Sequence, residues 1–324
     1  MTTEILEIKL TTEEFCSVSN LLDSVMNNEQ FLNQNTFLET AVLFSHELPR
    51  RIREKFYTYK RYEREPILLI KGNPIAESDI GHTPSNYVEL NDNFKLNRAQ
   101  ILHGLYGCLL GEPIGFSSQR KGSLYNNIIP LKEYEDVKNS SSGFKYEFGF
   151  HVEDAFHPAR PDYLGLVCMR NEECAKTIVS CIDGIDLPED MRDILFEYRY
   201  VNKHNVIHDT TGIINEEKQE IFFGNKLYPY LRINIATLNI EDYSEEEQVA
   251  IKKVVEHLNL NKVSVVLEPG DCVYIDNFRC VHARDPYNPD FGNNARWLSR
   301  LEFTNDLRKS QVFRKNKSSR VIEA

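Results

Sequence analysis

The stretch LEPGDCVYIDNFRCVHARDPY, residues 267–287, decides the fold that we predict for this chain. Its Glu-Pro-Gly-Asp segment is a turn signal, and the β-branched and aromatic run Cys272–Ile275 that follows is typical of a strand. Similar runs bounded by turn residues lie elsewhere in the second part of the chain: Tyr146–Val152, Tyr163–Met169, Leu231–Leu238, Val263–Leu267 and Trp297–Phe303. We therefore expect a body rich in short β-strands.

The first part of the chain has a different pattern. Residues 1–60 are expected to be mostly helical, because apolar residues recur three and four positions apart over 11–25 and 37–61. Further segments are predicted as helices at 97–111, 189–197 and 244–258, and as a strand at 66–71. Helices followed by a strand-rich body predict an α+β fold, in one domain around a barrel or sandwich.

Charge and composition exclude several classes of partner. The 324 residues include 38 Lys and Arg against 49 Asp and Glu, a net charge of −11, which disfavours binding to nucleic acid or to anionic membranes. No run approaches the ~18 apolar residues of a membrane span, and the N-terminus lacks the pattern of a secretory signal. Seven cysteines without paired spacing indicate free thiols. We expect a cytoplasmic protein.

A possible metal site follows the strand-like run that ends at Val152. His151 and Glu153 are two positions apart, so on a strand both side chains point to the same face. His282 could supply a third ligand. Two histidines and one carboxylate leave three positions open on an Fe(II) ion, which can take a bidentate 2-oxo acid and then O2. The His-x-Glu pattern alone is weak evidence, because chance often produces it in a chain with nine histidines.

Two arginines strengthen this interpretation. Arg296 and Arg300 follow His282 by 14 and 18 residues, within or beside an apolar strand. A guanidinium group can bind the distal carboxylate of 2-oxoglutarate through two parallel hydrogen bonds. A surface ion pair would explain neither this spacing nor the apolar neighbours of the arginines.

Three segments carry a resemblance to a known family: residues 151–171 (HVEDAFHPARPDYLGLVCMRN), 267–287 and 295–310 (ARWLSRLEFTNDLRKS). They resemble the clavaminate synthase-like branch of Fe(II)/2-oxoglutarate-dependent oxygenases, and within it the hydroxylases of free L-arginine, L-asparagine and L-lysine. The resemblance covers roughly residues 95–315. It implies one domain over 1–324 with a double-stranded β-helix (jelly-roll) core at 96–315. A mainly helical buttress at 1–95, a lid insertion near 200–225 and a tail at 316–324 would complete it.

The resemblance also implies roles for individual residues. It assigns His151, Glu153 and His282 to Fe(II), and it assigns Arg296 and Thr177 to 2-oxoglutarate. Substrate contacts would come from Arg300 for the α-carboxylate and, for the rest of the amino acid, from Gln119, Ser141, Ser142 and Asn234. O2 would be the second co-substrate.

These motifs say less about the identity of the substrate than about the metal and 2-oxoglutarate. Where arginine hydroxylases of the family carry aspartates for the guanidinium group, this chain has Asn234 and Ala236. This difference is compatible with a neutral or differently held substrate side chain, or with a cationic one held by lid carboxylates such as Asp209, Glu216 or Glu217. We therefore expect hydroxylation of C3 or C4 of a free L-amino acid, with L-lysine first among the basic amino acids.

Other outcomes remain open at this stage. They are an asparagine or arginine derivative or a carrier-bound residue as substrate, desaturation or cyclisation in place of hydroxylation, and a β-barrel binding protein without activity. The partner would be a small molecule, and a homo-oligomer is possible.

Several further residues have simpler interpretations. The glycines of GLYGCLLG, Gly104, Gly107 and Gly111, indicate close helix packing rather than a dinucleotide site, because no strand precedes them. His157 is expected to be structural, and Asp154 to make a hydrogen bond or salt bridge near the metal. His204 and His208 flank the expected lid and could touch the substrate, although exposed loop histidines are the more common case. The basic residues between 308 and 320 are expected to be a solvated C-terminal segment.

Overall fold

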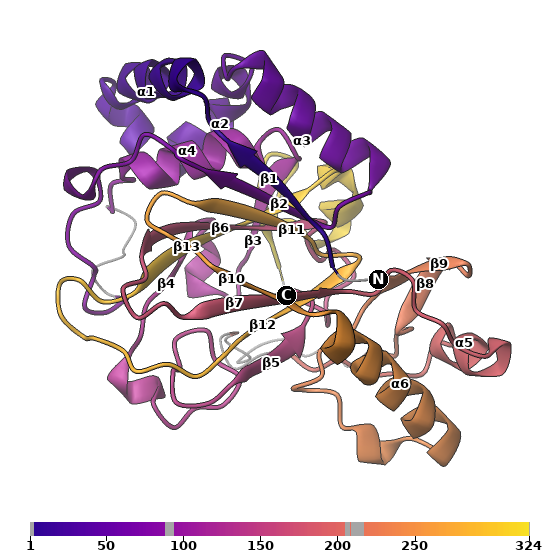
Figure 1. Cartoon of the computed structure of the whole chain (residues 1–324). Coiled ribbons are helices and arrows are strands. Elements are labelled where there is room, and N and C mark those ends of the chain that lie inside the picture. Colours follow the sequence, from indigo (N-terminus) through magenta and orange to yellow (C-terminus); the bar gives the residue numbers. More distant parts are fainter. Residues whose placement is uncertain (1–2, 88–93, 205–207, 209–216, 324) are drawn as a thin grey trace.

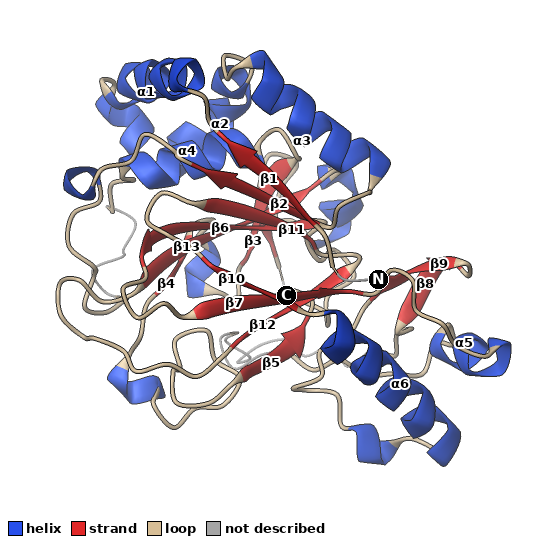
Figure 2. Ribbon diagram, viewed as in Figure 1, coloured by secondary structure: helices blue, strands red, loops and turns tan. Residues whose placement is uncertain are grey.

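Two β-sheets lie face to face at the centre of the molecule (Figures 1 and 2). The computed structural model describes residues 3–87, 94–204, 208 and 217–323. The larger sheet has the strand order β1 (Ile5–Lys9), β2 (Ile67–Lys71), β11 (Cys272–Asp276), β6 (Tyr163–Arg170), β13 (Trp297–Thr304), β3 (Glu112–Phe116) and β14 (Val321–Ile322), with β4 (Asn126–Ile128) paired to β13. The smaller sheet has the order β10 (Val263–Val266), β7 (Lys176–Cys181), β12 (Cys280–Arg284) and β5 (Phe148–His151).

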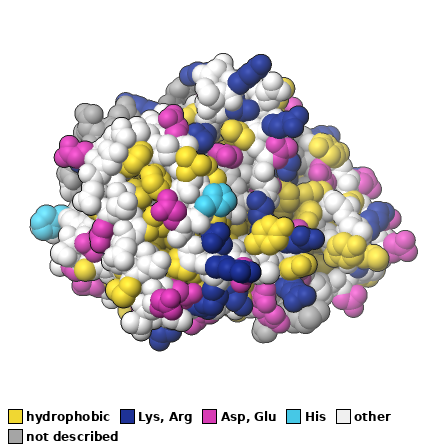
Figure 3. Space-filling model, turned by 90° about the horizontal axis from the view of Figure 1, so that it is seen from above, with side chains coloured by type: hydrophobic (Ala, Val, Ile, Leu, Met, Phe, Trp, Pro, Cys, Tyr) yellow, Lys and Arg dark blue, Asp and Glu magenta, His cyan; other side chains and the backbone are white. Residues whose placement is uncertain are grey.

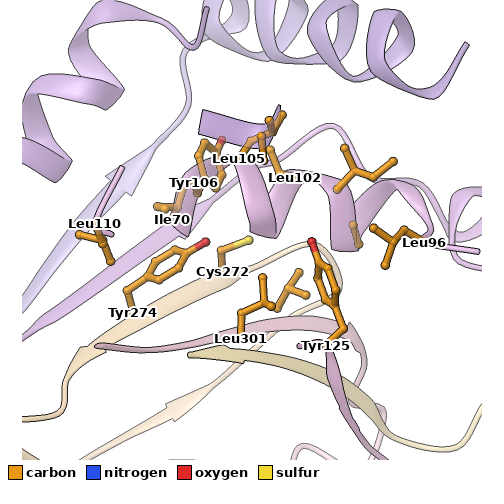
Figure 4. Packing of buried hydrophobic residues seen from close by; sticks show 14 of the residues in the cluster. Ile70, Leu96, Leu102, Leu105, Tyr106, Leu110, Tyr125, Cys272, Tyr274 and Leu301 are labelled. Carbon is orange, nitrogen blue, oxygen red and sulfur yellow. The ribbon is translucent and has the colours of Figure 1, made fainter. Parts of the chain in front are cut away.

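Helices cover the outer faces of both sheets. The larger sheet is covered by α1 (Thr12–Met26), α2 (Gln34–Ser45), α3 (Arg50–Tyr62) and α4 (Arg98–Gly107), whose buried side chains form one cluster with those of the sheet. Leu102, Leu105 and Tyr106 of α4 lie beside Tyr274 and Leu301 of the sheet (Figure 4). On the side of the smaller sheet lie α5 (Glu189–Leu195), α6 (Glu245–Asn261) and a hairpin of β8 (Phe222–Asn225) and β9 (Tyr228–Leu231). Short 3-10 helices occupy Glu29–Leu32, Glu77–Asp79, Arg120–Gly122, Lys132–Tyr134, Ile240–Asp242 and Leu307–Phe313.

A separate apolar layer joins the two sheets. Inward-facing residues of the larger sheet, such as Leu69 and Leu298, contact Val179, Val265 and Cys280 of the smaller one, and all are buried. The alternation of inward and outward side chains along each strand produces this layer. The predicted mixture of helices with a strand-rich body is therefore confirmed.

The structure corrects three of the expected elements. Residues 37–61 form two helices, α2 and α3, because Pro49 interrupts the run. Part of the segment 1–60 is not helical, since β1 pairs in parallel with β2. The strand expected at Leu231–Leu238 is wrong beyond Leu231. That segment turns, and it makes only a single bridge between Asn234 and His151.

The C-terminal residues belong to the larger sheet. Val321 and Ile322 pair in parallel with Gly115 and Phe116, and Ile322 is fully buried. The solvated segment was expected for the basic residues between 308 and 320, and the side chain of Lys315 among them is exposed. Seen from the helical side, the surface carries hydrophobic groups interspersed with Lys, Arg, Asp and Glu (Figure 3). No helix within the described ranges has the length and hydropathy needed to cross a membrane.

The glycines of α4 allow this helix to approach its neighbours closely. A Cβ atom at Gly107 would lie 1.9 Å from Cζ of Phe303 on β13, and one at Gly104 would lie 2.6 Å from Phe37 Cε1 and Tyr125 Oη. Both distances are far inside van der Waals contact. The close helix packing predicted for these glycines is confirmed.

Gly107→Ala should destabilise the protein by about 1–3 kcal/mol, because the added methyl group overlaps the buried ring of Phe303. Urea unfolding would measure the difference. Gly292→Ala is the control, since a Cβ there meets only the Asp290 side chain at 3.5 Å, and its effect should stay within about 0.5 kcal/mol. Equal stability of the two variants would show that α4 does not need the glycine.

Candidate active site

Strand pairing in the smaller sheet brings the three predicted metal ligands together. His151 at the end of β5 lies directly opposite His282 on β12, and their ring centroids are 4.1 Å apart. Glu153 follows just past β5, with its Oε2 atom 3.3 Å from His282 Nε2. One ligand atom from each of the three residues lies within 4.8 Å of the others. This spacing is compatible with one shared ion.

A buried asparagine fixes the turn that carries Glu153. The backbone N–H of Glu153 donates to Asn277 Oδ1 at 2.7 Å, and Asn277 Nδ2 donates to the Glu153 carbonyl at 3.1 Å. Asn277 itself lies in the turn between β11 and β12. The next residue, Asp154, has a φ of 49° in the left-handed region, where the chain leaves the strand. The sequence analysis missed Asn277, because this contact joins residues more than 120 positions apart.

The hydrogen bonds of His151 leave one ring nitrogen free for a metal. Its Nδ1 atom lies 2.8 Å from the carbonyl oxygen of Gly149, which can only accept, so Nδ1–H donates and Nε2 keeps its lone pair. Burial lowers the pKa of His151 to about 3, and the neighbouring His282 adds to this effect. The imidazole is therefore neutral at physiological pH, as metal binding requires.

Glu153 is held in its ionised form. Burial by itself would raise the pKa of Glu153, but the Arg300 guanidinium and His282 outweigh it and hold the pKa below its ordinary value. Arg300 Nη1 donates to Glu153 Oε1 at 2.6 Å, whereas the buried Oε2 atom accepts no hydrogen bond from a described residue. Two imidazoles and one carboxylate oxygen are the donor set of an Fe(II) site with three open positions.

A cavity extends from these residues between the two sheets. About 460 Å³ of it is free of protein atoms, a volume that includes space open to solvent at its mouth. Its polar lining includes Thr177 and Arg296, the two residues predicted to bind 2-oxoglutarate, together with Glu153, His282 and Arg300. Its apolar lining is Ile128, Phe148, Leu164, Leu166, Ala283 and Leu298.

The features of Arg296 suit an anion in this cavity. Arg296 is only 2% exposed, and its Nε donates to Asn171 Oδ1 at 3.2 Å. Its buried Nη1 atom has no hydrogen-bond partner among the described residues. A buried donor without a partner is costly, so a carboxylate bound here would satisfy it. The apolar walls suit the two methylene groups of 2-oxoglutarate.

Arg300 and Gln119, two of the predicted substrate contacts, lie side by side next to the metal ligands. Arg300 Nη2 donates to Gln119 Oε1, and Gln119 Nε2 donates to Asp154 Oδ1 at 3.1 Å. Arg300 Nη2 also lies 3.1 Å from Oε1 of the buried Glu302. The hydrogen bond expected for Asp154 is therefore present.

The structure separates the remaining predicted substrate residues. Ser141 lines the cavity, whereas the Ser142 hydroxyl bonds the Tyr87 hydroxyl instead. Asn234 lies beside the metal ligands through its bridge to His151, and its backbone N–H donates to Asn202 Oδ1 at 2.8 Å.

His208 corrects an expectation, because it is buried rather than exposed. It is 6% exposed, its Nε2 lies 2.9 Å from Asp154 Oδ1, and its Nδ1 lies 2.7 Å from Ser118 Oγ. Burial lowers its pKa to about 4. The acidic residue next to the His-x-Glu pattern was the only sequence signal for this contact. His157 packs on Phe116 and Phe313, which agrees with the structural role expected for it.

The predicted lid carboxylates are mostly outside the described residues. Asp209 and Glu216 lie there, so the structure places neither of them. Glu217 is described and is exposed to solvent.

The chain matches the family model "Taurine catabolism dioxygenase TauD, TfdA family" over residues 64–301, and it therefore belongs to that family. It is an Fe(II)/2-oxoglutarate-dependent dioxygenase of the amino acid hydroxylase type, which uses O2 as its second co-substrate. The predicted family resemblance is confirmed. Membership implies a jelly-roll core, in agreement with the two facing sheets.

Individual relatives are similar over most of their length. An enduracididine beta-hydroxylase of Streptomyces hygroscopicus is 29% identical, covering 98% of this chain and 100% of its own. Clavaminate synthase 2 of Streptomyces clavuligerus is 29% identical over 83% of this chain and 84% of its own. An L-lysine 4-hydroxylase of a Flavobacterium species is 24% identical over 88% and 79%.

A solved structure is also similar to this chain over nearly its whole length. The crystal structure of the non-heme iron oxygenase OrfP in complex with Fe and alpha-ketoglutaric acid superposes with a TM-score of 0.89. It is 28% identical in sequence, and the match covers 98% of this chain and all of the other.

His151→Ala and Glu153→Ala should each weaken Fe(II) binding by more than about 100-fold, because even groups that only orient metal ligands contribute 10- to 100-fold. Iron retained after anaerobic dialysis would be measured per chain. His46→Ala, at the end of α2 and outside the cavity, should bind iron as the unmodified protein does. Full iron content in either ligand variant would refute the ligand assignment.

Proposed function

We propose that this enzyme hydroxylates C3 or C4 of a free basic L-amino acid and releases succinate and CO2. One observation carries the proposal. One cavity is lined by His282 and Glu153 and also by the buried arginines Arg296 and Arg300, which supports the binding of two separate carboxylates. One carboxylate would belong to 2-oxoglutarate and the other to the amino acid.

The relatives bear on which amino acid is bound. Those named for the hydroxylation of enduracididine and of ornithine and arginine match 98% and 97% of this chain. The relative named L-lysine 4-hydroxylase is less similar. We therefore place arginine-like amino acids ahead of L-lysine, which remains a candidate substrate.

Each residue of the site would then have a defined task. His151, Glu153 and His282 would hold Fe(II), which together with 2-oxoglutarate and O2 supplies the oxidant for the C–H bond. Arg300 would bind the α-carboxylate of the substrate, with Gln119 beside it for the amino group. A misplacement of about 1 Å can cost a large factor in rate, so the buried contacts that fix these side chains would also fix the carbon that reacts.

The arrangement of the chain around the site supports further proposals. Residues 1–95 would buttress the jelly-roll core of a single domain, because α1–α3 cover the larger sheet while β1 and β2 extend it. The segment near 200–225 would act as a lid, because its described residue His208 reaches Asp154 beside the predicted metal ligands.

Seven free cysteines, four of them buried, favour a cytoplasmic location.

Assays with free L-arginine, L-ornithine, L-lysine and L-asparagine should give succinate coupled to a product 16 mass units heavier for at least one basic amino acid. Mass spectrometry and succinate release would measure this. A carrier-bound substrate or a different reaction would be indicated if no free amino acid reacts, or if the product has lost two hydrogens instead.

Arg300→Met should raise the KM for the amino acid by about 100-fold, because methionine lacks the buried positive charge that would pair with the α-carboxylate of the substrate. Binding of 2-oxoglutarate should change far less. Arg308→Met, on the short helix Leu307–Phe313, is the control and should change neither. An unchanged KM in Arg300→Met would refute its assignment to the substrate.

A further inference from the structure

We propose that Arg284 is a second cofactor-binding arginine, so that the distal carboxylate of 2-oxoglutarate lies between Arg284 and Arg296. This inference rests on the proposed assignment of Arg296 to the cofactor. It adds a residue that the family resemblance did not assign, and it concerns how the enzyme selects a dicarboxylic 2-oxo acid.

The strand register directs Arg284 into the cavity. Arg284 lies two positions after His282 on β12, so the two side chains share a face of the smaller sheet. On the neighbouring strand β7, Arg284 is paired with Thr177, just as His282 is paired with Val179. Arg284, Thr177 and Arg296 all line the cavity.

The charges of Arg284 and Arg296 are buried without a compensating anion. Arg284 is 7% exposed, and neither arginine forms an ion pair with a described residue. Among the residues that the structure describes, Arg284 donates only to the backbone carbonyls of Asp285 at 2.9 Å and Tyr146 at 3.4 Å, and none of them bonds its Nε. Two buried cations in one cavity are unfavourable unless an anion joins them.

The aromatic ring of Tyr287 lies close to both guanidinium groups. The guanidinium carbons of Arg284 and Arg296 lie 5.2 Å and 5.3 Å from the centroid of Tyr287. Tyr287 is itself held, because its backbone N–H donates to the Phe144 carbonyl at 3.0 Å. A ring within about 6 Å of a cation stabilises it, so Tyr287 supports both charges until a carboxylate binds.

The shape of the cavity identifies the anion by its chemical class. Leu164, Leu166 and Leu298 add apolar surface to the cavity that Arg284 and Arg296 share with Glu153 and His282. A ligand that fits this lining has a 2-oxo acid at one end, a short apolar chain and a second carboxylate at the other end. A monocarboxylic 2-oxo acid would leave Arg284 and Arg296 unsatisfied.

The test measures binding rather than turnover. Calorimetric titration of the Mn(II)-loaded protein, without amino acid, would give the Kd for 2-oxoglutarate and for 2-oxobutyrate, which lacks the distal carboxylate. In Arg284→Met the affinity for 2-oxoglutarate should fall by about 10- to 100-fold, the size expected for hydrogen bonds to a charged group. The affinity for 2-oxobutyrate should change by less than about 3-fold, and Arg284→Lys should give an intermediate result.

A matched variant separates this role from a structural one. Arg232 is also buried and also donates to a backbone carbonyl, that of Ala155, but it does not line the cavity. Arg232→Met should therefore leave the ratio of the two affinities unchanged, even if it lowers the thermal midpoint. Should Arg284→Met fail to fold, the ratio measured for Arg284→Lys decides the question.

The possible failures can be distinguished. An equal loss of affinity for both acids, or no loss for 2-oxoglutarate, in the Arg284 variants would refute the proposal. If Arg296→Met also left the affinity for 2-oxoglutarate unchanged, the assignment of this cavity to 2-oxoglutarate would be refuted. The absence of hydroxylation of free amino acids would contradict only the proposed substrate.

Discussion

The pairing of β5 with β12 is the constraint on which the rest of this active site depends. It sets His151 opposite His282, and the turn after β5 then brings Glu153 within reach of both. Because side chains alternate along a strand, a slip of one residue would turn one histidine away from the other. Asn277 ties the turn of Glu153 to the neighbouring hairpin and so resists such a slip.

The buried charged residues of the cavity are the second feature that organises the site. Arg300 contacts Glu153 and lies next to Glu302, so carboxylates of the chain balance its charge. Arg284 and Arg296 line the same cavity and form no ion pair with a carboxylate of the described residues. The substrate carboxylate proposed for Arg300 would therefore join an existing network of charges, whereas an anion at Arg284 and Arg296 would supply their first negative partner.

The sequence predicted the parts of the site whose geometry is local. His151 and Glu153 are two positions apart, and the period of a strand predicted that they would share a face. In the structure β5 ends at His151, and the turn that follows it brings Glu153 to the two histidines. Long-range contacts were not accessible in this way. His208 is buried and contacts Asp154, which lies 54 positions away along the chain, and the turn at Leu231–Leu238 includes the bridge between Asn234 and His151. A β-branched run without that context resembles a strand.

The sequence by itself determined the class of fold and the family, and it predicted the metal ligands, because short periodic patterns and contiguous motifs carry this information. The tertiary structure decided which charged groups share the cavity. Arg284 is an unremarkable residue of the motif CVHARD, and only the register of β12 against β7 places it opposite Thr177. The physical reason is that burial and pairing of a charge depend on neighbours that lie far away along the chain.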